Sequence, residues 1–150
     1  ARRRPCRAID RHGVAMERMT GIIFTDLGQA SSFMALDWVQ DLLEQRLGYH
    51  PFPATLNVRP KAAEDARIWR RVQSELTGTP LTSASDSHCA AKLFRVEIEA
   101  PGRAVKIGAA VLLPEVKDYP NDKIEIVAPV RLKDHLGVGD GDQLVVEFIN

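Results

Sequence analysis

Apolar residues recur along this chain at two spacings, and each spacing predicts a different kind of element. Residues 33–48 carry apolar side chains three or four positions apart, which is the spacing of one face of a helix. The residues on that face are Leu36, Val39, Leu43 and Leu47. Gly48 follows where a helix often ends in left-handed backbone, so the pattern predicts that the helix stops there.

The same spacing predicts two further helices. The longer one covers residues 62–78, with Gly78 at its end. Its apolar side carries Trp69, Val72 and Leu76. Residues 130–137 have room for only a short helix, and Gly137 stands at its end.

Alternation of apolar and polar residues predicts the strands, because a strand points every second side chain to the same face. The clearest case is residues 92–100, where Phe94, Val96 and Ile98 alternate with charged residues. Six strands are predicted, over residues 21–27, 55–59, 92–100, 104–114, 123–129 and 143–150. Residues 79–88, rich in Ser and Thr, are predicted to form a loop.

The order of these elements indicates the fold class. No long helix separates the last four strands, which argues against a doubly wound parallel sheet. We therefore expect a mainly β fold, in which an antiparallel sheet closes into a small barrel with peripheral helices. Residues 1–19 are rich in Arg and show no regular period, so we treat them as a peripheral extension of a barrel domain at 20–150.

Composition narrows the classes of protein. With 150 residues, 45% hydrophobic and 27% charged, the chain has the length and make-up of one globular domain. Its 20 basic and 20 acidic side chains cancel, which disfavours a nucleic-acid partner, since that binding depends on neutralising phosphates. No apolar run approaches the length needed to cross a membrane. We expect a cytoplasmic monomer.

Two features that resemble functional sites are better explained without chemistry. Cys6 and Cys89 lack the spacing of a zinc site or a disulfide framework, and we expect reduced thiols. The glycines of "GVGDGD" (137–142) follow a short helix and precede a strand, which reverses the context of a Rossmann phosphate loop. A turn is the expected structure there.

The segment "ATLNVRP" (54–60) carries a more specific signal. If Leu56 and Val58 face the core, then Thr55 and Asn57 share the opposite face. Their neutral oxygens suit a hard cation such as Mg²⁺, which keeps several waters and takes further oxygens from phosphates. A polar strand face that simply meets solvent is the alternative.

Two other segments suit the same chemistry. Residues 26–32, "DLGQASS", lead into the first predicted helix, where backbone N–H groups and hydroxyls could bind phosphate. Farther on, Glu125 lies on a strand face, and Arg131 and Lys133 follow beside Asp134. A plain loop with helix caps and a surface ion-pair cluster are the respective alternatives.

Taken in order, these segments resemble the archaeal-type CTP-dependent riboflavin kinase family. The family reads G-x-G after its first strand, then G-[FY]-x-P-x-x-G-T-L-N, [VL]-[VL]-P, E-I-I-A-P, [KR]-L-R-[ED] and L-x-D-G-D-x-V. This chain reads "DLGQAS", "GYHPFPATLN", "LLP", "EIVAP", "RLKD" and "LGVGDGDQLV". The resemblance covers about residues 20 to 149.

The resemblance implies a fold and a reaction. The fold is a six-stranded cradle-loop barrel, and the reaction transfers the γ-phosphoryl group of CTP to the 5′-hydroxyl of riboflavin, with Mg²⁺ as cofactor. Thr55 and Asn57 would ligate the metal, Asp118 and Glu125 would contact the flavin, and Glu125 would orient or deprotonate its hydroxyl. The implied nucleotide-binding residues are Asp26, Leu27, Gly28, Gln29, Ala30, Ser31, Arg131, Leu132, Lys133 and Asp134.

Three positions depart from the family pattern. Ala30 and Ala54 replace glycines, and Ser31 stands where a basic residue is usual. An alanine restricts φ and the approach of backbone to phosphate, and a serine offers no charge to the nucleotide. Two other functions therefore stay open: a barrel that binds flavin or nucleotide without catalysis, and a DNA-binding regulatory barrel.

Overall fold

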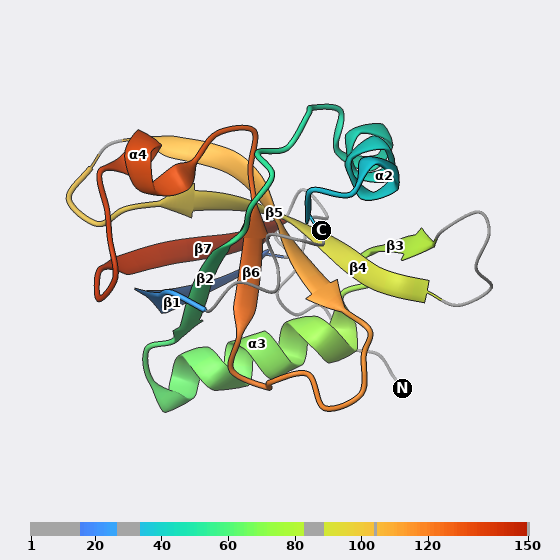
Figure 1. Cartoon of the computed structure of the whole chain (residues 1–150). Helices are drawn as coiled ribbons and strands as arrows, with labels where there is room; N and C mark the ends of the chain where they lie inside the picture. Colours follow the sequence, from blue (N-terminus) through green and yellow to red (C-terminus); the bar gives the residue numbers. More distant parts are fainter. Residues whose placement is uncertain (1–15, 27–33, 83–88, 104, 150) are drawn as a thin grey trace.

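The computed structural model of the chain describes residues 16–26, 34–82, 89–103 and 105–149 (Figure 1). The strands are β1 (Met16–Phe24), β2 (Leu56–Pro60), β3 (Thr79–Thr82), β4 (Cys89–Glu99), β5 (Lys106–Pro114), β6 (Ile124–Val127) and β7 (Gln143–Ile149). The helices within these residues are α2 (Asp37–Leu47), α3 (Ala63–Glu75) and α4 (Leu132–Leu136).

Six of the strands close into an antiparallel barrel. The sheet runs in the order β3-β4-β5-β6-β2-β1-β7, and β7 pairs again with β4. The closing register places Val96 opposite Phe148, with Phe94, Val96 and Ile98 buried as the alternation predicts. The predicted mainly β fold with helices outside a six-stranded barrel is therefore confirmed.

The loop predicted at residues 79–88 is wrong at its start. Residues 79–82 form β3, which pairs with the edge of β4 outside the closed barrel. Leu81 is 2% exposed and belongs to the apolar cluster that packs beneath α2. The strand was not predicted because the composition of "TPLT" does not indicate one. These residues become a strand by pairing with β4.

The first strand also starts earlier than predicted. β1 begins at Met16, and its backbone pairs along β7 from Met16↔Ile149 to Ile22↔Gln143. Met19 is 2% exposed in the main core. Residues 16–19, which the sequence analysis placed in the extension, thus belong to the barrel, and residues 1–15 lie outside the described chain.

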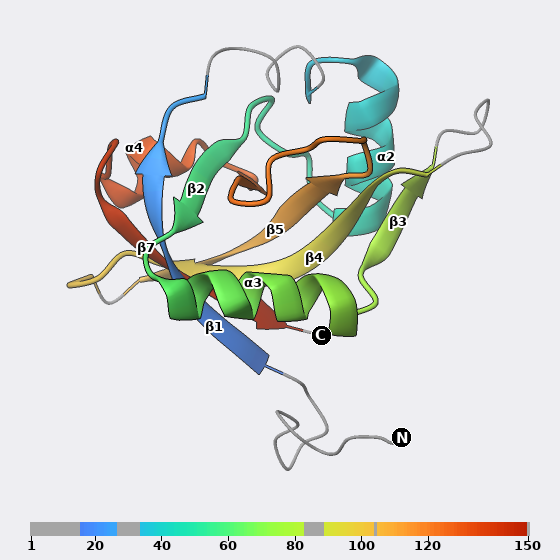
Figure 2. The same cartoon turned by 90° about the horizontal axis from the view of Figure 1, so that it is seen from below.

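An aromatic cluster joins α3 to the barrel, across which it lies in Figure 2. The Trp69 ring stacks on Phe148 with centroids 5.9 Å apart, and Phe94 meets both rings edge-on. Trp69 and Val72 are buried as predicted, and Leu76 is buried at the end of the helix. Aromatic pairs in these geometries add stability beyond the area they bury.

Helix α2 covers a second, smaller apolar cluster through Val39, Leu43 and Leu47. Gly48 ends it with φ +83, and its N–H donates to the Glu44 carbonyl, as the C-cap prediction requires. The prediction for Leu36 is wrong. The helix begins after this residue, whose backbone is extended, and the side chain is 44% exposed.

None of the described helices is both long and apolar enough to cross a bilayer.

Candidate active site

The polar face of β2 meets a carboxylate from β6. Leu56 and Val58 point into the core, so the alternation of the strand sends Thr55 and Asn57 to the other side. The antiparallel register places Asn57 directly opposite Glu125. Asn57 is 7% exposed and Glu125 only 3%, so these polar groups are embedded in the barrel wall.

Thr55 links the three side chains. Its hydroxyl oxygen lies 3.2 Å from Glu125 Oε1 and 3.4 Å from Asn57 Oδ1, and its single proton serves one of them at a time. The alternative that this face is ordinary solvated strand surface does not agree with that burial. The fold therefore brings Thr55 and Asn57, predicted to share a strand face, together with Glu125.

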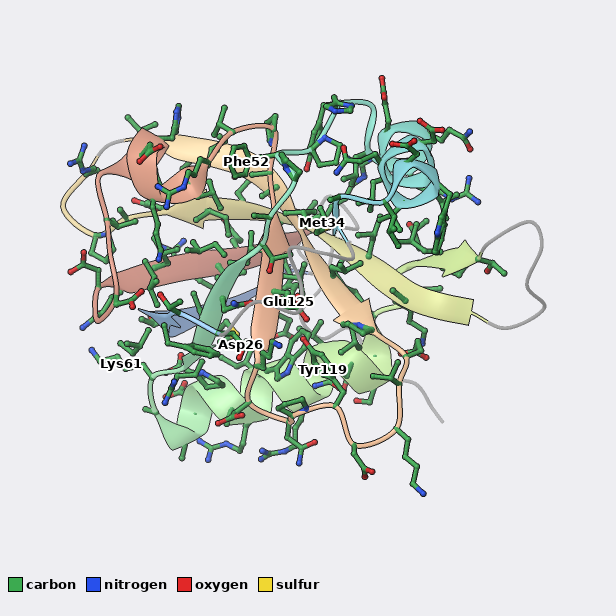
Figure 3. All side chains as sticks on the ribbon, in the orientation of Figure 1. Asp26, Met34, Phe52, Lys61, Tyr119 and Glu125 are labelled. Atoms are coloured by element: carbon green, nitrogen blue, oxygen red, sulfur yellow. The ribbon has the colours of Figure 1, made fainter. Side chains whose placement is uncertain are left out.

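The second oxygen of Glu125 faces two residues that the sequence analysis missed. The Tyr119 hydroxyl donates a hydrogen bond to Glu125 Oε2, and Lys123 Nζ lies 3.9 Å from the same oxygen. Lys123 also donates to Asp26 Oδ2. Figure 3 shows Asp26, Glu125 and Tyr119 gathered in the middle of the molecule.

The environment keeps the Tyr119 phenol protonated. Burial raises its pKa well above the ordinary value, and the hydrogen bond to Glu125 and the negative charges of Glu125 and Asp26 raise it further. Tyr119 thus acts as a donor to Glu125 over the whole physiological pH range. The carboxylate is held at both ends, by Thr55 at Oε1 and by Tyr119 at Oε2.

The oxygens at this place fit a hard cation. Thr55 Oγ1 and Asn57 Oδ1 are neutral oxygens near a buried carboxylate, the ligand type that Mg²⁺ accepts when waters and phosphates complete its shell. The described residues contain no group of three or more His, Cys, Asp or Glu suited to hold a metal. A magnesium ion here would therefore depend on the nucleotide for further ligands.

A pocket of about 110 Å³ opens on one side of Thr55. Arg131 and Lys133 line it from the start of α4, and Leu132 contributes to its wall although its own side chain is 4% exposed. The remaining lining residues are Phe52, Ala54, Leu56, Ile126, Ala128 and Val130. Apolar walls with two cations at the rim suit a nucleotide base and its phosphates.

Ion pairs hold the two cations of this pocket at the surface. Arg131 lies 2.8 Å from Asp134, which does not line the pocket. Lys133 lies 3.2 Å from Asp140, which also accepts a hydrogen bond from Thr25. The contacts of Asp140 with Thr25 and Lys133 lower the pKa of its carboxyl, and the Thr25 hydrogen bond is the larger cause.

A second hollow of about 370 Å³ lies beyond Tyr119. Its walls come from α3 and the segment between β5 and β6: Trp69, Gln73, Leu113, Pro114, Glu115, Val116, Tyr119, Pro120 and Asn121. Val116 is 58% exposed at its edge, so apolar surface is open to a ligand. The two residues that hold Glu125, Thr55 and Tyr119, therefore each line a different hollow.

The other predicted site residues are placed as follows. Asp118 belongs to the same segment, with φ +65 and an exposed side chain, but it does not line the hollow. Asp26 lies at the end of β1, bonded to Lys123. Residues 27–31, which complete the predicted nucleotide loop, lie outside the described residues.

Of the two residues that the sequence analysis missed, one could have been predicted from the sequence and the other could not. Lys123 stands two positions before Glu125, so strand alternation alone would place both side chains on one face. Tyr119 reaches Glu125 only because the turn at 120–123 folds back, and no spacing rule marks that contact.

Comparison with known proteins places the chain among relatives. Residues 23–148 match the family model CTP-dep_RFKase, described as "Domain of unknown function DUF120". A riboflavin kinase of Pyrobaculum arsenaticum is 34% identical over 139 residues, and one of Methanococcoides burtonii is 32% identical over 129 residues. These matches cover 91% and 84% of this chain but 62% and 54% of the relatives, so the chain spans little more than half of their length. The match of most of its residues to that family model shows that this chain belongs to the CTP-dependent riboflavin kinase family.

Proposed function

We propose that this chain phosphorylates riboflavin to FMN, with CTP as the phosphoryl donor and Mg²⁺ as the cofactor. The observation that carries the proposal is the place of Glu125. Its two oxygens accept hydrogen bonds from Thr55 and Tyr119, and these two residues line separate hollows. A buried carboxylate therefore stands between two candidate substrate sites. A reaction that joins two substrates needs such a place.

The nucleotide occupies the hollow beside α4. Arg131 and Lys133 supply positive charge at its rim, and before the nucleotide binds Arg131 is paired with Asp134. The family resemblance also assigns Asp26 and residues 27–31 to the nucleotide, and of these Asp26 lies among the described residues.

Arg131 is held by an ion pair with Asp134, and Lys133 by an ion pair with Asp140 and a hydrogen bond to Thr25 Oγ1. Weak contacts of this kind at the surface can be exchanged for phosphate oxygens.

The flavin occupies the hollow beside α3. Tyr119, Pro114 and Val116 offer apolar and aromatic surface for a flat ring system. The ribityl chain then extends past Tyr119 toward Glu125. Asp118, on the exposed turn next to Tyr119, contacts the flavin from outside the hollow.

The transfer step needs a hydroxyl in line with the γ-phosphorus. The 5′-oxygen of riboflavin bonds to that phosphorus while the bond to the β–γ bridging oxygen breaks, and CDP leaves. Glu125 accepts a hydrogen bond from the hydroxyl and orients it, and the carboxylate takes up the proton as the new oxygen–phosphorus bond forms. When bound at Thr55 and Asn57, Mg²⁺ supplies neutralisation of phosphate charge and a fixed template for the two reacting groups.

A donor screen tests the proposal. The chain is incubated with riboflavin, Mg²⁺ and each nucleoside triphosphate in turn, and FMN is measured by chromatography with fluorescence detection. FMN formed with CTP is the expected result. Flavin binding without product under every donor would instead identify a non-catalytic barrel, and salt-sensitive retention on DNA would identify a regulatory one.

The proposal includes a monomer acting in the cytoplasm. The polar chain from Thr55 to Tyr119 lies within one copy, so a single chain suffices to form it. Gel filtration with light scattering measures the molecular mass. A specific activity, per mole of chain, that rises with protein concentration would contradict a monomer.

A further inference from the structure

Lys123 occupies an unusual place for a lysine. It stands directly before β6, and its side chain is only 13% exposed. Its ammonium group donates a hydrogen bond to Asp26 Oδ2 and lies 3.9 Å from Glu125 Oε2. The same nitrogen lies 5.5 Å from the centre of the Tyr119 ring.

The largely buried position of Lys123 requires that its positive charge be compensated by Asp26 and Glu125. A charge taken out of water is tolerated only when opposite charges and hydrogen bonds compensate it, and here one ammonium serves two carboxylates. Glu125 itself is 3% exposed, so it has little access to water as an alternative partner. Without Lys123, the buried Glu125 and the partly exposed Asp26 would both lose the cation that they share.

The two acids belong to different sides of the proposed reaction. Asp26 follows the end of β1 and leads into the segment assigned to the nucleotide. Glu125, on β6, faces the acceptor hydroxyl and is held by Thr55 and Tyr119. Lys123 thus contacts one residue on the proposed donor side of the site, Asp26, and one on the proposed acceptor side, Glu125.

We propose that Lys123 is a positioning residue for phosphoryl transfer. It fixes the separation of Asp26 and Glu125, and through them the alignment of the γ-phosphorus with the flavin hydroxyl. This inference rests on the proposed kinase function. Because transfer requires reacting atoms about 3 to 3.5 Å apart, and a misplacement of about 1 Å lowers rates about 100-fold, such a contact affects the rate more than binding.

The test is a set of variants of the full chain assayed for FMN formation. Lys123→Met should lower kcat by about 30-fold and change KM for riboflavin and CTP by less than about threefold, since the contact sets alignment. Lys123→Arg, which keeps a cation of similar reach, should recover most of the loss. Lys61→Met is the matched control, because Lys61 is exposed beyond the end of β2 and lies apart from Glu125 in Figure 3.

A double-mutant cycle tests whether Lys123 acts through its contact with Asp26. Asp26→Asn should also lower kcat, and the combined Lys123→Met, Asp26→Asn variant should lose little more than either alone, because both act through one contact. Additive losses would overturn the proposal, as would a loss confined to KM for CTP or a Lys123→Met variant with normal kcat. Circular dichroism melting of each variant separates these outcomes from loss of fold.

Failure of the wider function gives a different pattern. A wild-type chain that makes no FMN with any donor would overturn the kinase function, and with it the role of Lys123. An active wild type with an unaffected Lys123→Met variant would overturn the role of Lys123 alone.

Discussion

The face of β2 and β6 and the start of α4 are both polar, but they are built differently. On the strand face, Asn57 is 7% and Glu125 3% exposed, and Glu125 is bonded at both oxygens. At α4, the side chains of Arg131 and Asp134 are 50% and 75% exposed and pair across one turn. Barrel packing fixes the first group, whereas an exposed ion pair contributes at most about 1 kcal/mol and is easily exchanged.

This difference suggests a division of roles. Buried polar groups held in one geometry suit the transfer step, which gains from groups arranged before the substrates arrive. Exposed cations suit the capture of a nucleotide, since they can move onto phosphate at little expense. Variants of the strand face should therefore change kcat, and variants of α4 should change KM.

The largest effect is expected for Asn57→Ala. It removes one of the two neutral oxygens proposed to hold Mg²⁺, and kcat should fall by about 1,000-fold, since metal stabilisation of phosphoryl transfer is worth several kcal/mol. FMN formation at rising Mg²⁺ concentration measures it. Asn57→Asp, which keeps an oxygen at the site, is the control, and normal turnover of the alanine variant would mean that the metal lies elsewhere.

The next effect is expected for Glu125→Gln. Thr55 and Tyr119 both donate toward this side chain, and an amide offers only one acceptor oxygen between them. We expect kcat to fall by about 100-fold with KM for riboflavin nearly constant, the range usual for a lost proton acceptor. A variant that changes KM alone would place Glu125 in binding rather than in the transfer step.

A smaller effect is expected for Arg131→Ala. It removes a cation at the rim of the hollow proposed to bind the nucleotide, so KM for CTP should rise by about tenfold while kcat stays within about twofold. Arg18→Ala is the matched control, because Arg18 is an exposed residue in surface ion pairs at β1. A fall in kcat for Arg131→Ala would remove the distinction between the two regions.

The smallest effect concerns stability at high pH. Burial raises the pKa of Tyr49 to about 12, and burial and Glu125 raise the pKa of Tyr119 well above its ordinary value. Above about pH 10 the unfolded chain loses protons that these folded phenols keep, so the free energy of unfolding falls with pH, by at most about 1.4 kcal/mol per pH unit for each. Below about pH 10 both states are protonated, and this contribution is fully present.

Urea unfolding between about pH 9 and 11 measures this slope. Tyr49→Phe should reduce the slope and leave stability at neutral pH unchanged or higher, because the buried Tyr49 hydroxyl has no hydrogen-bond partner among the described atoms. Tyr119→Phe should reduce the slope too, but it should also lower kcat through Glu125. Equal slopes in wild type and both variants would contradict the assigned pKa shifts.

Local patterns predicted much of this fold. Alternation over residues 92–100 identified the inward face of β4, and helical spacing with Gly48 identified α2 and its end. Both patterns depend on residues close in sequence, where side-chain direction follows from backbone geometry. The predictions for Leu36 and for the loop at 79–82 were wrong because the boundaries of α2 and β3 depend on what they pack against.

The candidate site divides in the same way. Thr55 and Asn57 share a face because they are two residues apart on a strand, and Glu125 shows its polarity among apolar neighbours. Tyr119 and Lys123 acquire their roles from the turn before β6, which brings them to the same carboxylate. Asp26 joins them from the far end of β1, 97 residues from Lys123 in sequence.

The sequence alone determined the periodicities, the strand faces and the ordered motifs that resemble one kinase family, since each is written in neighbouring residues. Only the tertiary structure decided that both oxygens of Glu125 accept hydrogen bonds, that Lys123 is shared by two acids, and that the two donors to Glu125, Thr55 and Tyr119, line separate hollows. The reason is physical. Antiparallel pairing places β6, β2 and β1 side by side in the sheet, and the burial of Asn57 and Glu125 there strengthens the contacts that these residues make.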